Sequence, residues 1–281
     1  MNLTNPEELA ALLKKFGFHT QKKLGQNFLV CEKTLQTIIE AAGIQENDEI
    51  LEIGPGPGAL TQEILKSSAK KIDALEVDAK IIPVLEYVIK SDQLSQSGDG
   101  LSKEILRQAQ DDRVFIHNIS ALEYFPKISN YLLIANIPYY LTSPILRHYL
   151  AGEKKPKRVV LLVQKEVAEK ICCKDSDQSI LSLQVALYGK AEIVSFVKKE
   201  QFFPAPKVDS AIIKIEMFES CLIPEDKLKG FWKITKHAFA QKRKKIGNTL
   251  GKAFDIPFEE LGIDTNRRPQ TLSIKEWRSL L

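Results

Sequence analysis

The feature that most constrains this chain is the segment 50–61, Ile-Leu-Glu-Ile-Gly-Pro-Gly-Pro-Gly-Ala-Leu-Thr. Its pattern predicts a short buried strand over 49–53, a tight turn, and then a helix that begins near Ala59. The turn contains three glycines, Gly54, Gly56 and Gly58. Because glycine has no side chain, such a turn lets a ligand lie close against the backbone. The segment therefore predicts a nucleotide-type site at a strand-to-helix turn.

A second predicted strand, over 71–78, carries an acidic residue at an informative distance. Glu76 falls about 20 residues past the loop, where nucleotide-binding αβ units place the acceptor for ribose hydroxyls. Pro55 and Pro57 separate the glycines and have no backbone N–H to donate to a pyrophosphate. The expected ligand has a ribose and an adenine but no phosphates, as S-adenosylmethionine (SAM) has. Two alternatives stay open: NAD, against which the prolines count, and a turn that only reverses the chain.

Alternating strand and helix patterns predict a doubly wound, Rossmann-like α/β sheet. Further strands are expected over 114–117, 131–135, 158–163, 191–197 and 208–217. Helices are expected over 5–19, 32–42, 80–90, 143–150, 164–172 and 180–188. The last two strands could close the sheet with an antiparallel edge. From about Pro224 the pattern is helical to the end, which predicts a small all-helical domain beyond a boundary near residue 220.

The segment 91–112 interrupts this alternation. It is rich in Ser, Gln and Asp and is much longer than an ordinary connection between elements. We expect a surface insertion, helical in part over 102–110, that forms neither a domain nor a functional site.

Composition excludes several classes of protein. With 44% hydrophobic and 27% charged residues, the chain has ample material for a packed core, so wholesale disorder is not expected. No apolar run approaches about 18 residues, and the N-terminus lacks the order of a secretory signal, so neither a membrane span nor export is expected. The cysteines and histidines show no disulfide framework and no metal-ligand spacing, which indicates free thiols in a reducing cytoplasm and no metal.

The net charge of +4 is unevenly distributed along the chain. Basic residues gather near the N-terminus, at Lys14, Lys15, Lys22 and Lys23, and in a run near the C-terminus, Lys242, Arg243, Lys244 and Lys245. Such runs are often only a solvated face. Two basic clusters flanking a nucleotide-type fold still favour a polyanionic partner, and nucleic acid is the expected one.

A second motif, Asn136-Ile-Pro-Tyr139, ends a predicted strand at the edge where open α/β sheets bind ligands. The exocyclic amine of adenine is a poor nucleophile because its lone pair is delocalised into the ring. The Asn136 side-chain oxygen and the Pro138 carbonyl can each accept one N–H of that amine and draw the nitrogen toward tetrahedral geometry. Tyr139 can stack on the base. No strong general base is needed, because the sulfonium is reactive and positioning lowers much of the barrier. The alternative is a plain strand end and turn.

With both motifs in view, the chain resembles the ribosomal RNA adenine N6-dimethyltransferases over nearly its whole length, except for 91–112. The resemblance rests, in order, on Leu24-Gly-Gln-Asn-Phe-Leu29, Glu52-Ile-Gly-Pro-Gly-Pro-Gly58, Glu76, Asn136-Ile-Pro-Tyr139, Gln164-Lys-Glu-Val167, Phe203-Pro-Ala-Pro-Lys-Val-Asp-Ser210 and Phe239-Ala-Gln-Lys-Arg-Lys-Lys245. Among relatives it looks most like the bacterial enzyme that dimethylates two adjacent adenosines near the 3′ end of small-subunit (16S) rRNA. The large-subunit resistance methylases are the nearest rival.

The resemblance implies a SAM-binding methyltransferase domain over 1–220 and a helical RNA-binding domain over 221–281. It implies three groups of site residues. The cofactor site would contain Gln26, Asn27, Leu29, Gly54, Gly56, Gly58, Glu76, Ser120 and Asn136. The catalytic residues that hold the target adenine would be Asn136, Pro138 and Tyr139. RNA would be contacted by Phe203, with Phe202 as a second candidate for stacking, by Lys207, and by a basic C-terminal helix with Lys242, Arg243, Lys244 and Lys245.

One position departs from the family pattern. After the third strand the family usually has Asp-Ala-Leu, whose Asp contacts the adenine amine of the cofactor, whereas here Ser120 occupies that place. A serine hydroxyl is shorter and uncharged, so this contact is expected to weaken or to pass through water. Asn118 would substitute only if the loop shifted.

Three hypotheses for function follow. The first is an enzyme that dimethylates rRNA adenines with SAM in successive transfers and so takes part in rRNA processing and ribosome biogenesis. The second is an RNA-binding factor for assembly of the small subunit (the pre-30S particle) with weak or lost catalysis. The Ser120 departure keeps this hypothesis open, but the intact Asn136-Ile-Pro-Tyr139 argues against lost catalysis. The third, an NAD-dependent oxidoreductase, lacks a visible pyrophosphate site. A monomer is expected.

Overall fold

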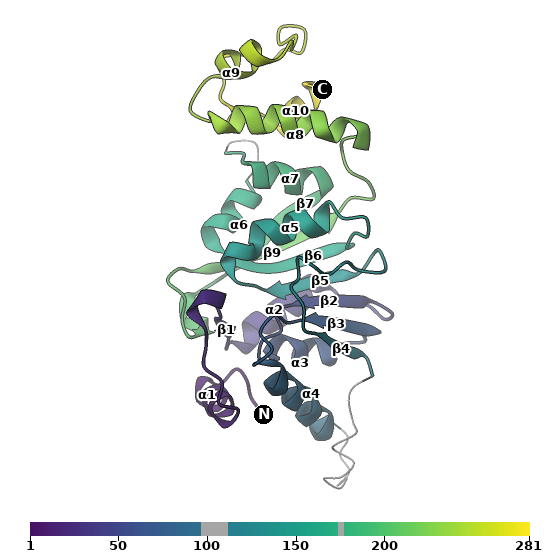
Figure 1. Cartoon of the computed structure of the whole chain (residues 1–281), viewed down its shortest axis with the longest axis vertical. Coiled ribbons are helices and arrows are strands. Elements are labelled where there is room, and N and C mark those ends of the chain that lie inside the picture. Colours follow the sequence, from purple (N-terminus) through teal and green to yellow (C-terminus); the bar gives the residue numbers. More distant parts are fainter. Residues whose placement is uncertain (97–111, 174–176) are drawn as a thin grey trace. The chain divides into compact units, whose positions relative to one another are not determined.

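The computed structural model describes residues 1–96, 112–173 and 177–281 (Figure 1). Its internal contacts divide it into two compact units. Unit 1 consists of Met1–Lys165 and Ile193–Lys214, and unit 2 of Glu166–Glu192 and Ile215–Leu281. The second unit thus includes residues well before position 220, and the assignment of 221–281 as an RNA-binding domain stays a prediction.

A seven-stranded sheet has the strand order β4-β3-β2-β5-β6-β9-β7. The strands are β2 (Glu49–Ile53), β3 (Lys71–Leu75), β4 (Val114–His117), β5 (Leu132–Asn136), β6 (Arg158–Gln164), β7 (Gly189–Val197) and β9 (Ser210–Met217). Strands β2 to β6 pair in parallel. The chain runs outward from β2 to β4 and then returns to place β5 on the other side of β2. Because parallel crossovers are right-handed, this reversal places helices on both faces of the sheet. The doubly wound α/β fold is confirmed.

The helices of unit 1 lie close to their predicted positions. They are α1 (Pro6–Lys15), α2 (Glu32–Ala42), α3 (Ala59–Leu65), α4 (Ile82–Gln96) and α5 (Thr142–Leu150). Helix α1 is shorter than expected, because Gly17 adopts a left-handed conformation with φ of 62°. Helix α4 is longer and takes up the start of the segment 91–112. The helix expected over 102–110 falls outside the described residues.

The core of unit 1 forms where the parallel strands are covered on both faces. Strands β5 and β6 are apolar and buried along almost their whole length, as parallel strands in such folds are. Helix α2 packs against β5, β6 and α3, and α3 packs against α4. The buried stripe of α2 is Thr34, Leu35, Ile38 and Ala42, which explains the helical spacing of its apolar residues.

A second, two-stranded sheet was not predicted. Strand β1 (Phe28–Leu29) pairs antiparallel with β8 (Phe202–Phe203). The pairing is extended by the Val30 amide, which donates to the Gln201 carbonyl at 2.8 Å. It joins two segments that are far apart in the sequence and fixes the residues that precede β1 near the glycine loop.

Unit 2 is largely helical, as expected for the C-terminal part of the chain. Its helices include α7 (Ile180–Tyr188), α8 (Glu225–Ala240), α9 (Ile246–Ala253) and α10 (Ile274–Ser279), and α6 (Lys165–Ile171) leads into it. Helix α7 packs against α8 and α10, which explains why it belongs to this unit. The buried Trp277 stacks on Phe239 with a centroid distance of 5.7 Å. Among the described helices, none is both long and apolar enough to cross a membrane.

Candidate functional site

The register of the parallel strands brings the two sequence motifs together. Ile53 of β2 lies opposite Leu75 of β3 and opposite Ala135 of β5. The next residues along the chain, Gly54, Glu76 and Asn136, therefore follow at one edge of the sheet, where the strand order reverses. Open α/β sheets bind ligands at such a point.

A cavity of about 220 Å³ opens at this edge, within unit 1. Eleven of the predicted site residues line it: Gln26, Asn27, Leu29, Gly54, Gly56, Glu76, Ser120, Asn136, Pro138, Tyr139 and Phe202. The predicted residues Gly58, Phe203, Lys207 and Lys242 to Lys245 are not part of its wall. The cavity wall is mostly apolar, with a few polar groups that converge on it, as in small-molecule sites generally.

The three glycine amides of the loop all donate hydrogen bonds to other groups of the protein. The Gly54 N–H donates to the Leu75 carbonyl at 2.9 Å, and the Gly58 N–H donates to the Pro55 carbonyl at 3.0 Å. The Gly56 N–H donates to a Glu76 carboxylate oxygen at 3.2 Å. The intervening prolines have no N–H at all. This turn therefore has no amide left for a pyrophosphate, and it fits SAM better than NAD.

Two of the loop glycines are required for steric reasons. Gly56 has φ of 55°, and a Cβ there would lie 3.0 Å from the ring of Phe28. Gly58 has φ of 99°, and a Cβ there would lie 2.9 Å from Leu85 of α4. The close approach at Gly56 lets β1 cover the loop, whereas that at Gly58 lets α3 pack on α4. A direct role of Gly58 in cofactor binding stays a prediction.

Glu76 is buried at the cavity and oriented by backbone amides. One carboxylate oxygen accepts the Gly56 N–H and the other accepts the Asp78 N–H at 2.9 Å. Burial raises the pKa of Glu76, and the hydrogen bonds from Asp78 and Gly56 oppose this shift. Each oxygen keeps a lone pair, so the side chain can still accept hydrogen bonds from ribose hydroxyls.

Asp78 was not singled out from the sequence, although it follows Glu76 closely. Its Oδ2 accepts hydrogen bonds from Gln21 Nε2 at 3.0 Å and from Gln26 Nε2 at 2.8 Å. Because the side chain of Asp78 is buried, these charge-assisted bonds hold the segment 21–26 beside the cavity. The hydrogen bond from the Gln26 side chain to Asp78 therefore fixes the position of Gln26 in the cavity wall.

Glu52 lies behind the loop on β2 and was also missed as a titratable group. It is fully buried, its Oε2 accepts a hydrogen bond from Thr61 Oγ1 at 2.8 Å, and its Oε1 has no partner among the described residues. Burial raises the pKa of Glu52 to about 8, which the Thr61 hydrogen bond opposes and the nearby charge of Glu76 reinforces. Nothing in the sequence distinguishes Glu52 from an exposed acidic residue on a strand, and its burial is seen only in the folded structure.

The three predicted catalytic residues are fixed in different ways. Asn136 Nδ2 donates to the Asn27 carbonyl at 3.4 Å, so its Oδ1 faces away from that bond, and no described donor occupies it. The Pro138 carbonyl accepts the Leu141 N–H at 2.9 Å and keeps its second lone pair. The Tyr139 hydroxyl lies 2.7 Å from Oγ of the buried Ser210. Burial raises the pKa of Tyr139, so its phenol is neutral.

The loop after β4 places Ser120 in the cavity wall. Ser120 Oγ accepts the Leu122 N–H at 3.3 Å, and its proton remains available to donate. Asn118 Nδ2 donates to the Glu76 carbonyl at 2.8 Å, and Asn118 is not part of the cavity wall. The loop is tied to α5 by the Tyr149 hydroxyl, which donates to the Ala121 carbonyl at 2.7 Å.

The two phenylalanines of β8 occupy different places. Phe202 is buried and lines the cavity, whereas Phe203 is half-buried, packs against the core and is not part of the wall. Neighbouring strand residues point to opposite sides, which explains the difference. The stacking role assigned first to Phe203 stays a prediction. Lys207 is exposed beyond this strand.

In unit 2 the basic run is not helical, contrary to expectation. The residues Lys242, Arg243, Lys244 and Lys245 are exposed and form the turn between α8 and α9. Their C-terminal end is fixed to the loop 264–268: Lys245 Nζ donates to Asn266 Oδ1 at 2.9 Å, and the Ile246 N–H donates to the Arg267 carbonyl at 2.8 Å.

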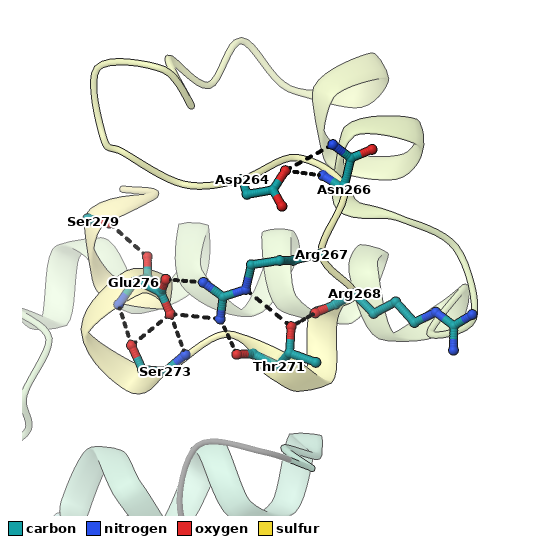
Figure 2. Close-up of polar contacts among 8 residues, drawn as sticks. All are labelled: Asp264, Asn266, Arg267, Arg268, Thr271, Ser273, Glu276 and Ser279. Carbon is teal, nitrogen blue, oxygen red and sulfur yellow. Dashed lines mark hydrogen bonds and ion pairs between the residues drawn. The ribbon is translucent and has the colours of Figure 1, made fainter.

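Neighbouring arginines in that loop have contrasting surroundings. Figure 2 shows the guanidinium of Arg267 turned toward Glu276 and Thr271, while the side chain of Arg268 points away from this network. Glu276 also accepts hydrogen bonds from Ser273, which caps α10. Arg267 therefore stabilises the C-terminal helix, and the exposed Arg268 adds to the positive charge beside the basic run.

Comparison with known proteins agrees with this geometry. The model of a family described as ribosomal RNA adenine dimethylase matches residues 17–281. The chain belongs to the ribosomal RNA adenine dimethylase family. One relative, the ribosomal RNA small subunit methyltransferase A of Dehalococcoides mccartyi (strain CBDB1), is 35% identical over 276 residues, which cover 96% of this chain and 90% of that protein.

Solved structures share the fold of this adenine dimethylase. A dimethyladenosine transferase from Plasmodium falciparum superposes with a TM-score of 0.72 at 26% identity, covering 90% of this chain and 96% of that one. The 23S rRNA methyltransferase ErmE superposes with a TM-score of 0.70 at 23% identity, covering 90% and 98%, and shows the fold alone. The family resemblance inferred from the motifs is confirmed: the chain is a SAM-dependent rRNA adenine methyltransferase, and the oxidoreductase hypothesis is wrong.

Proposed function

We propose that this chain transfers two methyl groups from SAM to N6 of each of two adjacent adenosines near the 3′ end of small-subunit (16S) rRNA. The observation that carries the proposal is the shared cavity: Glu76 and Asn136 both line it, and no described donor occupies Oδ1 of Asn136. The expected substrate is an assembling small-subunit particle in the cytoplasm, and the chain acts as a monomer.

The cofactor would be held by the loop and by the segment that covers it. Glu76 accepts the ribose hydroxyls, Gly54 allows the cofactor to lie against the backbone, and Asn27 and Leu29 close over its methionine and ribose end. When bound, SAM supplies an activated methyl group on a sulfonium. The apolar wall excludes water, which protects that group and strengthens the polar contacts in the site.

The target adenine would be activated by hydrogen-bond acceptors and not by a general base that removes a proton. Asn136 Oδ1 and the Pro138 carbonyl accept the two N–H bonds of the exocyclic amine, which localises the lone pair on N6. Tyr139, anchored by Ser210, presents a fixed ring for stacking on the base. After the first transfer one N–H remains, so one acceptor is enough to orient the amine for the second. The proton released in each transfer passes to solvent.

The positive groups outside the cavity would bind the RNA backbone. Lys207 lies beyond β8, and Lys242 to Lys245 form the exposed turn in unit 2. Lysine and arginine side chains on turns bind phosphates without reading the bases. Their contribution should therefore be the same for any RNA sequence, and the choice of adenosines depends on the cavity and on the shape of the particle.

One observation favours a second candidate, an assembly factor with weak catalysis. Ser120 replaces the family's Asp at the cofactor adenine, and its hydroxyl is partly engaged by Leu122. Methyl transfer to particles of each ribosomal subunit that lack the modification, followed by mass spectrometry of the digested rRNA nucleosides, tests the proposal. We expect dimethyladenosine in the small-subunit rRNA. Label in the large-subunit rRNA, or none in either, would refute it.

A further inference from the structure

We propose that the ring of Tyr140 forms a second base-binding subsite, which stacks on the nucleotide next to the target adenosine. The inference rests on the proposed function, because it concerns the RNA that enters this cavity. It assigns a binding role to a residue whose neighbour, Tyr139, is the expected stacking residue for the target base.

The two adjacent tyrosines differ in exposure and in hydrogen bonding. Tyr139 is half-buried, and its hydroxyl is bound to the buried Ser210. Tyr140 also belongs to the cavity wall, yet 60% of its surface is exposed. Within the described chain its hydroxyl has no hydrogen-bond partner and its ring has no aromatic neighbour. A large aromatic side chain at a cavity mouth, unused by the protein's own packing, is available to a ligand.

The backbone beneath Tyr140 is well fixed. The residue lies in the short helix η3 (Tyr139–Leu141), closed by the Leu141 N–H to the Pro138 carbonyl and by Thr142 Oγ1, which donates to the Tyr139 carbonyl at 3.1 Å. On the other side, Gly25 has φ of 61°, and a Cβ there would lie 3.1 Å from Pro138 Cβ and 3.7 Å from Tyr140 Cε1. Gly25 therefore lies beside the ring near its hydroxyl end, while most of the side chain stays open to solvent.

The chemistry of this position suits a base beside an extruded one. Taking an adenosine out of a stack leaves its neighbour without a partner on one face, and an aromatic ring can replace that partner. Stacking of this kind tolerates any base, so the same subsite accepts either adenosine of an adjacent pair while the other is in the cavity. The exposed Lys23, which leads into Gly25, adds positive charge for the connecting phosphate.

The test uses the full chain saturated with S-adenosylhomocysteine and a single-stranded RNA with the two adjacent adenosines. A second RNA has the non-target adenosine replaced by an abasic ribose, and a third has 2-aminopurine there, whose fluorescence falls on stacking. The variants are Tyr140→Leu and Tyr140→Phe. Phe125→Leu is the matched control, because Phe125 is 72% exposed in the same unit but lies outside the cavity wall.

We expect Tyr140→Leu to weaken binding of the first RNA about tenfold, within the range of base–aromatic stacking. Tyr140→Phe and Phe125→Leu should bind like the wild type. The wild type should bind the abasic RNA about tenfold more weakly than the first RNA, and Tyr140→Leu should bind the abasic RNA no more weakly than the wild type does. The quenching of 2-aminopurine fluorescence should disappear only in Tyr140→Leu.

If Tyr140→Leu weakens binding of the first RNA and of the abasic RNA equally, or weakens neither, the inference is overturned. Methyl transfer by the wild type would still support the proposed function. A wild type that neither binds these RNAs nor methylates small-subunit particles would overturn both.

Discussion

Glu52 should be protonated in the folded protein at neutral pH, and this makes the free energy of unfolding depend on pH. The side chain is fully buried on β2, one oxygen is bonded to Thr61, and the other has no partner in the described part of the chain. Burial raises its pKa from 4.5 to about 8. The folded protein thus binds this proton more tightly than the unfolded chain does.

The sign and size of the effect follow from linkage. A raised carboxyl pKa gives stability that is fully present below pH 4.5 and is lost as the pH rises toward 8. The loss approaches about 1.4 kcal/mol for each pH unit. Between pH 5 and pH 8 the free energy of unfolding should therefore fall by about 3 to 4 kcal/mol because of this group alone.

Urea denaturation of the wild type and of Glu52→Gln at several pH values measures this. Glutamine has the same shape, keeps an oxygen for Thr61 and cannot ionise. The other titrating groups are common to both proteins, so the difference between them reports Glu52. We expect Glu52→Gln to gain about 3 to 4 kcal/mol of unfolding free energy relative to the wild type between pH 5 and pH 8. Glu49→Gln, on the same strand but partly exposed, is the matched control. A difference between wild type and Glu52→Gln that does not change with pH would refute the reasoning.

Three further predictions concern ligands. Glu76→Gln should raise the SAM dissociation constant at least about tenfold in calorimetry, since a charged hydrogen-bond acceptor contributes about 1.5–3 kcal/mol. Because burial raises the Glu76 pKa, SAM affinity of the wild type should weaken with falling pH sooner than for an ordinary carboxylate, and the Gln variant should lack this dependence. Ser120→Asp should tighten SAM binding several-fold; an unchanged constant contradicts the role given to this position. Replacing Lys242, Arg243, Lys244 and Lys245 by Gln should lower the salt slope of RNA binding by about 0.7–0.9 per lost phosphate contact, with Lys275→Gln on α10 as a control. An unaltered slope would mean that the run is only a solvated face.

Much of the site could be predicted because its signals are local. The glycine and proline pattern over 54–58 dictates a turn whose amides are scarce, and a strand precedes it. Glu76 and Asn136 end strands that pair with β2, so the parallel register brings them to one edge. These relationships need only the strand positions and the right-handed crossover rule.

The rest depends on tertiary packing that the sequence does not display. Strands β1 and β8 have two residues each, too few for a periodic pattern, and they pair across most of the chain. Which of Phe202 and Phe203 faces the cavity depends on the parity of that register. The burial of Glu52 and the hydrogen bond between Asp78 and Gln26 arise from tertiary packing, so they cannot be inferred from the sequence.

The most direct test of the central claim is transfer of labelled methyl groups from SAM to small-subunit particles that lack the modification, with Asn136→Ala beside the wild type. SAM and particle binding are measured for both proteins. The account predicts dimethyladenosine at two adjacent positions with the wild type and at least about 100-fold slower transfer with Asn136→Ala, while both proteins bind the particle. A wild type that binds the particle but transfers nothing, or an Asn136→Ala variant that transfers at the wild-type rate, would contradict it.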